Sequence, residues 1–129
     1  MQIKTHNSIE QSLCGKPITV EEGRSEVCLM CTQNMAADSR GLVHGGFIFG
    51  LADYAAMLAV NHPNVVLGSA ETRFLKPSRV GDVLVARAQD QTPDERKHEV
   101  LVDVLCGEDT VFSGKFICFV TKQHVLENA

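Results

Sequence analysis

Residues 47–60 read FIFGLADYAAMLAV, fourteen positions that are all apolar or small except Asp53 and Tyr54. Alanine and leucine favour helix, and this run is long for a strand. Pro63 disfavours helical geometry at His62, so we expect the helix to end near Asn61. A helix that is apolar all round is a buried helix. Other parts of the chain must therefore wrap around it.

Strand-like segments lie on both sides of this helix. They are rich in Val, Phe, Thr and Ile, and they cover residues 18–21, 25–33, 65–75, 82–91, 97–106 and 111–121. The links between the last four are short and rich in turn formers, which predicts an antiparallel meander. We therefore expect an α+β fold in which an antiparallel sheet of about six strands wraps around one long central helix. The surplus of apolar surface predicts a homodimer or a dimer of dimers.

Length and composition limit the possible classes of protein. A chain of 129 residues, 44% apolar and 22% charged, is expected to form one globular domain. A net charge of −4 argues against a general nucleic-acid or anionic-membrane binder. No apolar run reaches the roughly eighteen residues of a membrane span. The first six residues lack the apolar core of a secretory signal. Five cysteines, an odd number, fit reduced thiols in the cytoplasm.

Asp53 is the first candidate for chemistry. It is the only ionisable residue besides Tyr54 in the apolar helix. An unpaired carboxylate in such surroundings costs several kcal/mol or takes up a proton. Two interpretations stay open. In the first, Asp53 lies on a solvated side of the helix or pairs with a neighbouring backbone group or Arg. In the second, it is a base or nucleophile held in a water-poor cleft.

The second candidate is the sequence His44-Gly45-Gly46 just before the helix. The first N–H groups of a helix lack internal partners and lie at the positive end of its dipole, so they polarise a carbonyl placed there. The alternative is an ordinary glycine turn with a surface histidine. Gly45 and Asp53 lie roughly 12 Å apart along one helix. If they act together, two antiparallel helices related by a two-fold axis must supply one residue each.

Other motifs are weak. Cys28 and Cys31 have C-x-x-C spacing, but an odd separation on a strand places them on opposite faces, and no metal site is expected. No phosphate-cradling loop or dinucleotide fingerprint is present. The histidines outside the glycine motif are expected to be exposed: His6, His62, His98 and His124.

The stretch from His44 to Asp53 resembles the signature of hotdog-fold acyl-CoA thioesterases. It is most similar to the branch that contains the phenylacetate-pathway thioesterase and related aromatic acyl-CoA hydrolases. Residues 74–77, 80–82 and 84–86 resemble that branch's strand–turn–strand segment, and the likeness covers about residues 25–121. The resemblance implies a single hotdog domain over residues 1–129. It implies hydrolysis of a CoA thioester at a dimer interface, with no cofactor beyond the CoA of the substrate.

The resemblance also implies roles for individual residues. Gly45 donates its N–H to the thioester carbonyl, His44 helps to orient that group, and the partner's Asp53 attacks the carbonyl or activates water. Asp38 stands where relatives often carry an amide that places the water. Ser69 is the candidate hydroxyl on the following strand, with Glu71 and Thr72 nearby. The remaining substrate-binding candidates are Gly46 and the basic residues suited to the CoA phosphates: Arg40, Arg73, Lys76 and Arg79.

Two other functions fit the same fold. One is a non-catalytic acyl-CoA sensor, which normally lacks the acid and carries a DNA-binding segment. We expect no room for such a segment before the first strand. The other is a hotdog hydratase or dehydratase, which also uses a histidine and a carboxylate. The sequence does not indicate which acyl group is bound.

Overall fold

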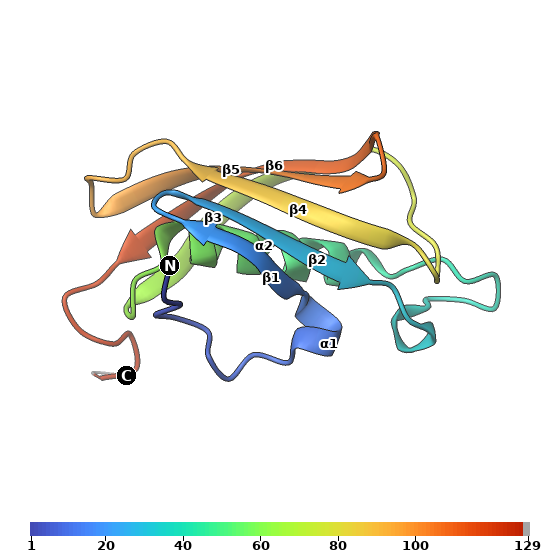
Figure 1. Cartoon of the computed structure of the whole chain (residues 1–129), viewed down its shortest axis with the longest axis horizontal. Coiled ribbons are helices and arrows are strands. Elements are labelled where there is room, and N and C mark those ends of the chain that lie inside the picture. The colour runs from blue at the N-terminus through green and yellow to red at the C-terminus, as the bar shows by residue number, and fades with distance from the viewer. Residues whose placement is uncertain (128–129) are drawn as a thin grey trace.

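The computed structural model describes residues 1–127 (Figure 1). Short helices occur at α1 (Gln11–Cys14) and at the 3-10 turn η1 (Gln33–Met35), and the long helix is α2 (Gly45–Val60). The strands are β1 (Lys16–Glu21), β2 (Arg24–Met30), β3 (Val65–Phe74), β4 (Val83–Asp90), β5 (Lys97–Cys106) and β6 (Asp109–Val120).

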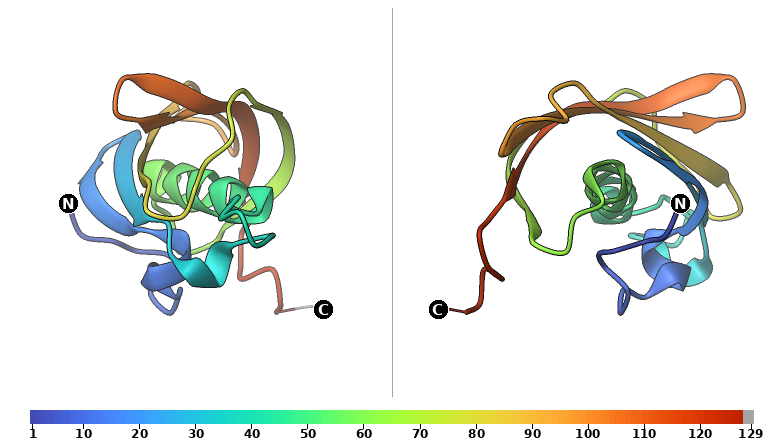
Figure 2. Two further views of the ribbon diagram at one scale, coloured as in Figure 1. Left: turned by 90° about the vertical axis from the view of Figure 1, so that its right-hand side faces the viewer. Right: turned by 60° about the vertical axis from the view of Figure 1, so that its left-hand side comes forward.

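The six strands form one antiparallel sheet in the order β1-β2-β4-β5-β6-β3. The sheet arches over α2, and the N-terminal segment with α1 lies beside the helix on the open side (Figure 2). Alternating residues of the strands meet the helix in one core, which includes Val27, Leu84, Val102 and Phe112. The predicted wrapping of an antiparallel sheet around one central helix is confirmed.

The predicted meander of four strands is wrong in one place. β4, β5 and β6 are consecutive neighbours, but β3 pairs with β6 at the edge of the sheet instead of with β4. The link after β3 passes the start of α2, where Leu42 and Arg79 form a β-bridge, and β4 then pairs with β2. Turn-forming residues indicate where a strand ends, but they do not indicate which edge the next strand joins. β2 also ends at Met30 and does not continue to Gln33.

The ends of α2 are set locally. The helix begins at Gly45 and ends before Asn61, which has the left-handed conformation with φ of 52°. The Asn61 side chain also ties down the N-terminal segment. Its Oδ1 accepts a hydrogen bond from Lys4 N, and its Nδ2 donates to Gln2 O, each at 2.8 Å. One asparagine therefore ends the helix and anchors the chain start beside it.

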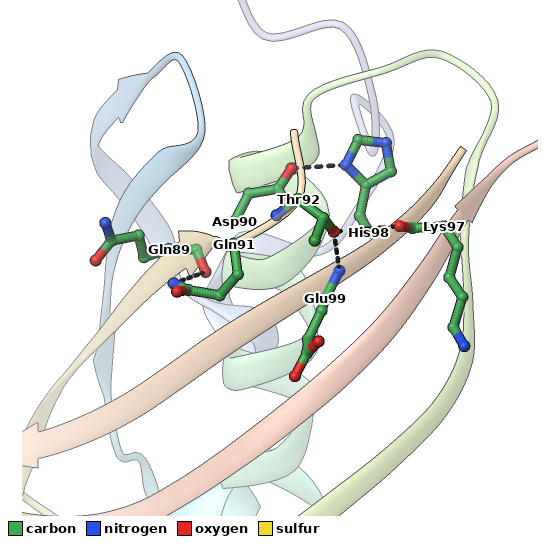
Figure 3. A network of polar contacts seen from close by, with 7 residues as sticks. All are labelled: Gln89, Asp90, Gln91, Thr92, Lys97, His98 and Glu99. Carbon is green, nitrogen blue, oxygen red and sulfur yellow. Dashed lines mark hydrogen bonds and ion pairs between the residues drawn. The ribbon is translucent and has the colours of Figure 1, made fainter. Parts of the chain in front are cut away.

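A buried polar network braces the turn between β4 and β5 (Figure 3). His98 Nδ1 lies 2.6 Å from Asp90 Oδ2, and the other Asp90 oxygen accepts a hydrogen bond from Thr92 N. Thr92 Oγ1 accepts a hydrogen bond from Glu99 N. The expectation that His98 is exposed is wrong, because it is 6% exposed. Asp90, eight residues earlier on the neighbouring strand, supplies the partner that a buried imidazole requires.

Candidate functional site

An open stripe, only partly covered by the rest of the chain, runs along α2. Gly46, Gly50 and Asp53 are spaced so that they lie on one side of the helix, whereas most other helix positions are buried against the sheet. A Cβ atom placed at Gly50 would meet nothing within 4 Å. In the single chain this side of the helix is open around Gly50.

The Asp53 carboxyl is the least compensated polar group on this stripe. Its Oδ1 is buried and has no hydrogen-bond partner, and no ion pair within residues 1–127 involves Asp53. Burial raises the pKa of Asp53 from its ordinary value to about 6. A carboxyl group in this state is poised to take up or release a proton near neutral pH.

The start of α2 presents free amide groups. His44 precedes the helix with extended backbone (φ −62°, ψ 130°), and no side chain caps the first turn. The His44 N–H donates to Met35 O at 2.9 Å, which fixes the entry of the chain. The His44 ring lies so close to Gly46 that a Cβ there would stand 3.0 Å from it. The imidazole therefore sits beside amides that are suited to a carbonyl oxygen or an anion.

A basic pocket lies at the loop that leads to α2. It has a volume of about 240 Å³ and is lined by Asp38, Arg40, Leu42, Pro77 and Arg79. Asp38 Oδ1 accepts hydrogen bonds from Arg40 N at 2.9 Å and from Leu42 N at 3.2 Å, so the carboxylate shapes its own loop. The structure thus brings Asp38, Arg40 and Arg79 together at the loop that leads to His44. The role of Asp38 in placing water stays a prediction.

Three other candidate residues lie outside this cluster in the single chain. Lys76 Nζ is 3.1 Å from Asp109 Oδ1 in an exposed ion pair. Arg73 pairs with Ser113 of strand β6, and Ser69 pairs with Ile117 of the same strand. These two β6 positions alternate with the buried Phe112 and Phe116. The Arg73 and Ser69 side chains therefore lie on the outer face of the sheet, away from α2.

The position of Ser69 on the outer face of the sheet has a local cause. The pairing of β3 with β6 shifts between Leu67 and Ser69, so one extra residue, Gly68, enters the strand. This bulge reverses the alternation of side chains. Thr72 and Phe74 consequently lie on the inner face, opposite Gly114 and Phe112. Glycine within a strand often marks a bulge, and Gly68 was the available signal.

Comparisons with curated proteins give two kinds of relative. The chain is 54% identical over 116 residues to the methylthioribose-1-phosphate isomerase of Aquifex aeolicus, covering 90% of this chain and 25% of that protein. It is 27% identical over 125 residues to the transcription factor FapR of Caldanaerobacter subterraneus, covering 96% of this chain and 62% of that protein. The chain thus spans between a quarter and about three-fifths of the length of these relatives.

Solved structures share the whole architecture. An uncharacterized protein of Pyrococcus horikoshii, PH1136, is 52% identical with a TM-score of 0.97, over 98% of both chains. The PaaI protein of the E. coli phenylacetic acid degradation operon is 26% identical with a TM-score of 0.76, over 84% of this chain and 85% of that one. A hypothetical thioesterase of Streptococcus pneumoniae, solved with coenzyme A, has a TM-score of 0.76 at 23% identity, over 84% and 87%. This last likeness concerns the fold.

A family model completes the comparison. The model of the family described as "Thioesterase superfamily" matches residues 40–112, which span the start of α2, Asp53 and strands β3 to β5. None of the helices described within residues 1–127 combines the length and apolar character that a bilayer crossing requires. The arched antiparallel sheet around one helix is a hotdog fold, and the chain belongs to the thioesterase superfamily.

Proposed function

We propose that this chain hydrolyses acyl-CoA thioesters at a site that two copies form together. One copy supplies the helix start with His44, Gly45 and Gly46, and the other supplies Asp53. In the net reaction one water is consumed, the bond between the carbonyl carbon and sulfur breaks, and the products are the free acid and CoA thiol. The observation that carries the proposal is the buried Asp53 Oδ1 without a partner.

Asp53 supplies the basic group in this mechanism. Its carboxylate either takes a proton from the attacking water or attacks the carbonyl carbon itself. The second route breaks the bond to sulfur, expels the CoA thiolate, which takes up a proton, and leaves a mixed anhydride on Asp53. Water then hydrolyses the anhydride to the free acid and restores the Asp53 carboxylate. Both routes need an ionised carboxyl with a lone pair free of other partners, and the unpartnered Asp53 Oδ1 supports this role.

The helix start supplies electrostatic stabilisation. The carbonyl oxygen becomes an oxyanion when the tetrahedral intermediate forms, and preorganised N–H donors stabilise that charge. The Gly45 amide would donate to it, with His44 beside the carbonyl. Arg40 and Arg79 in the adjacent pocket would bind the CoA phosphates through their guanidinium groups.

The distance between the two groups supports a site built from two copies. Gly45 and Asp53 are separated by roughly 12 Å along one helix, too far for both to reach one carbonyl. Two features support pairing of copies. The stripe at Gly46, Gly50 and Asp53 is only partly covered, and β3 leaves ten residues of strand at the edge of the sheet. Long exposed edge strands are templates for pairing with another chain.

The direct test is thiol release from a panel of short, long, branched and aromatic acyl-CoA esters. We expect hydrolysis of at least one class, and a loss of orders of magnitude in kcat in Asp53→Asn with the fold retained. Equal turnover in wild type and Asp53→Asn would remove Asp53 from the mechanism.

The alternative is an acyl-CoA sensor, which the similarity to FapR transcription factors favours. A sensor would bind the same esters tightly and leave them intact. Calorimetric binding together with the thiol assay separates the two functions, since only the hydrolase releases CoA.

A further inference from the structure

Phe74 is the one large aromatic residue of β3, and it lies directly against the helix start. Its ring is 3.1 Å from the position that a Cβ of Gly45 would occupy, with a second ring atom at 3.4 Å. Behind it the ring meets the buried Phe112 edge-on, with centroids 5.0 Å apart and planes at 77°. Phe74 therefore fills the space beside Gly45 where any other residue would place its side chain.

The other side of the Phe74 ring is not covered. Phe74 is 54% exposed, although its neighbour Phe112 on the same face is completely buried. An apolar ring that only filled the core would be expected to lie deeper. The uncovered ring surface adjoins the Gly45 amide, which the proposed function assigns to the thioester carbonyl. A group bound at that amide would have the ring as its nearest apolar neighbour.

We propose that Phe74 is a specificity-determining residue that selects acyl groups unbranched at the carbon next to the carbonyl. This inference rests on the proposed function, because it takes Gly45 as the site of the carbonyl. The ring packs against Gly45 and has Phe112 behind it, so it cannot move away from the Gly45 amide into the core. A methyl branch on the carbon beside the carbonyl lies within reach of the ring when the carbonyl oxygen is at the amide. An unbranched chain leaves the ring in place.

The test compares butanoyl-CoA with its branched isomer 2-methylpropanoyl-CoA. We expect wild type to prefer the unbranched ester in kcat/KM, and Phe74→Leu and Phe74→Ala to reduce that preference about tenfold, the discrimination that one methyl group provides in an apolar pocket. Phe119→Leu and Phe119→Ala are the matched controls. The Phe119 ring also covers a glycine, Gly68, but on the outer face of β6 and about 26 Å along β3 from Phe74 at about 3.3 Å per residue.

Binding separates this inference from the proposed function. In the Asp53→Asn background neither ester should be cleaved, and calorimetry gives the ratio of the two Kd values with Phe74 or with leucine at position 74. Absence of thiol release by wild type, with a Kd ratio that shifts about tenfold on Phe74→Leu, would reject the hydrolase and keep the selective role of Phe74. The inference is overturned if wild type shows no preference between the esters or binds neither. It is also overturned if the preference is unchanged in Phe74→Leu while the thermal midpoint shows a folded protein.

Discussion

Burial keeps the Asp53 carboxyl protonated at higher pH than an exposed carboxyl, yet the proposed reaction needs it ionised. Its pKa is raised to about 6 by burial, so the carboxyl is mostly neutral below that pH and mostly ionised above it. We predict that kcat/KM rises with pH through about 6 and levels above it. The measurement is a pH–rate profile for the best ester. A profile without an ascending limb in wild type would contradict a catalytic carboxylate at this position.

The same shift predicts a gain in stability on removing the charge. A folded-state pKa raised above the unfolded value of 3.8 means that the stabilising contribution of the neutral carboxyl is present below pH 3.8 and is lost as pH rises to about 6. At pH 7.5 the buried charge therefore destabilises the fold, at roughly 1.4 kcal/mol per pKa unit. We expect Asp53→Asn to raise Tm at pH 7.5. We also expect the decrease in Tm that wild type shows between pH 4 and 6 to be smaller in this variant. A lower Tm at pH 7.5 would show that the carboxylate has a partner that stabilises it.

Gly45 allows the amide to be removed almost by itself. It is the first residue of α2, where proline is well tolerated, and His44 already has the extended backbone that a following proline requires. We predict that Gly45→Pro lowers kcat by about 10²–10³, the usual cost of losing one oxyanion donor. Gly45→Ala is the control, because it places the same Cβ against Phe74 and keeps the N–H. Equal losses of kcat in Gly45→Pro and Gly45→Ala would show that contact of the new Cβ with the Phe74 ring, and not the missing N–H, causes the effect.

At the scale of elements, α2 was predictable almost to the residue and the order of the strands was not. A run that is apolar at nearly every position predicts a helix buried over most of its surface, and Pro63 marks its end, so the local sequence is sufficient to predict α2. The position of β3 in the sheet depends on the path of the segment between β3 and β4, which passes the start of α2. No residue within β3 indicates that path. The inner placement of Thr72 and Phe74 depends in turn on the bulge at Gly68. The basic residues illustrate the same limit. Arg79 lines a pocket with Asp38 and Arg40, whereas Arg73, six positions earlier, faces outward.

The open stripe of α2 gives a prediction about association. A Cβ atom at Gly50 meets nothing within 4 Å apart from the backbone of its own helix, and any residue other than glycine or proline is a better helix former. We expect Gly50→Leu to keep or raise the Tm of the isolated chain, yet to shift sedimentation toward monomer and to lower hydrolysis. Gln89→Leu is the control, since it adds the same side chain at an exposed position on the sheet and should change neither property. A dimer of normal stability in Gly50→Leu would move the interface away from this stripe.

For the whole molecule, the central question is whether each site takes its two halves from two chains. Asp53→Asn and Gly45→Pro should each be inactive, for different reasons. A heterodimer of the two variants contains one site with an intact Gly45 and an intact Asp53, and a second site with both changes. In an equal mixture that exchanges freely, about half of the dimers are mixed, so a two-chain site restores about a quarter of wild-type activity. A site within one chain restores none, because no chain in the mixture carries both residues. Thiol release measured during subunit exchange, with exchange followed by mass, distinguishes these outcomes. Recovery of activity at the rate of exchange is the result that the 12 Å separation along one helix requires.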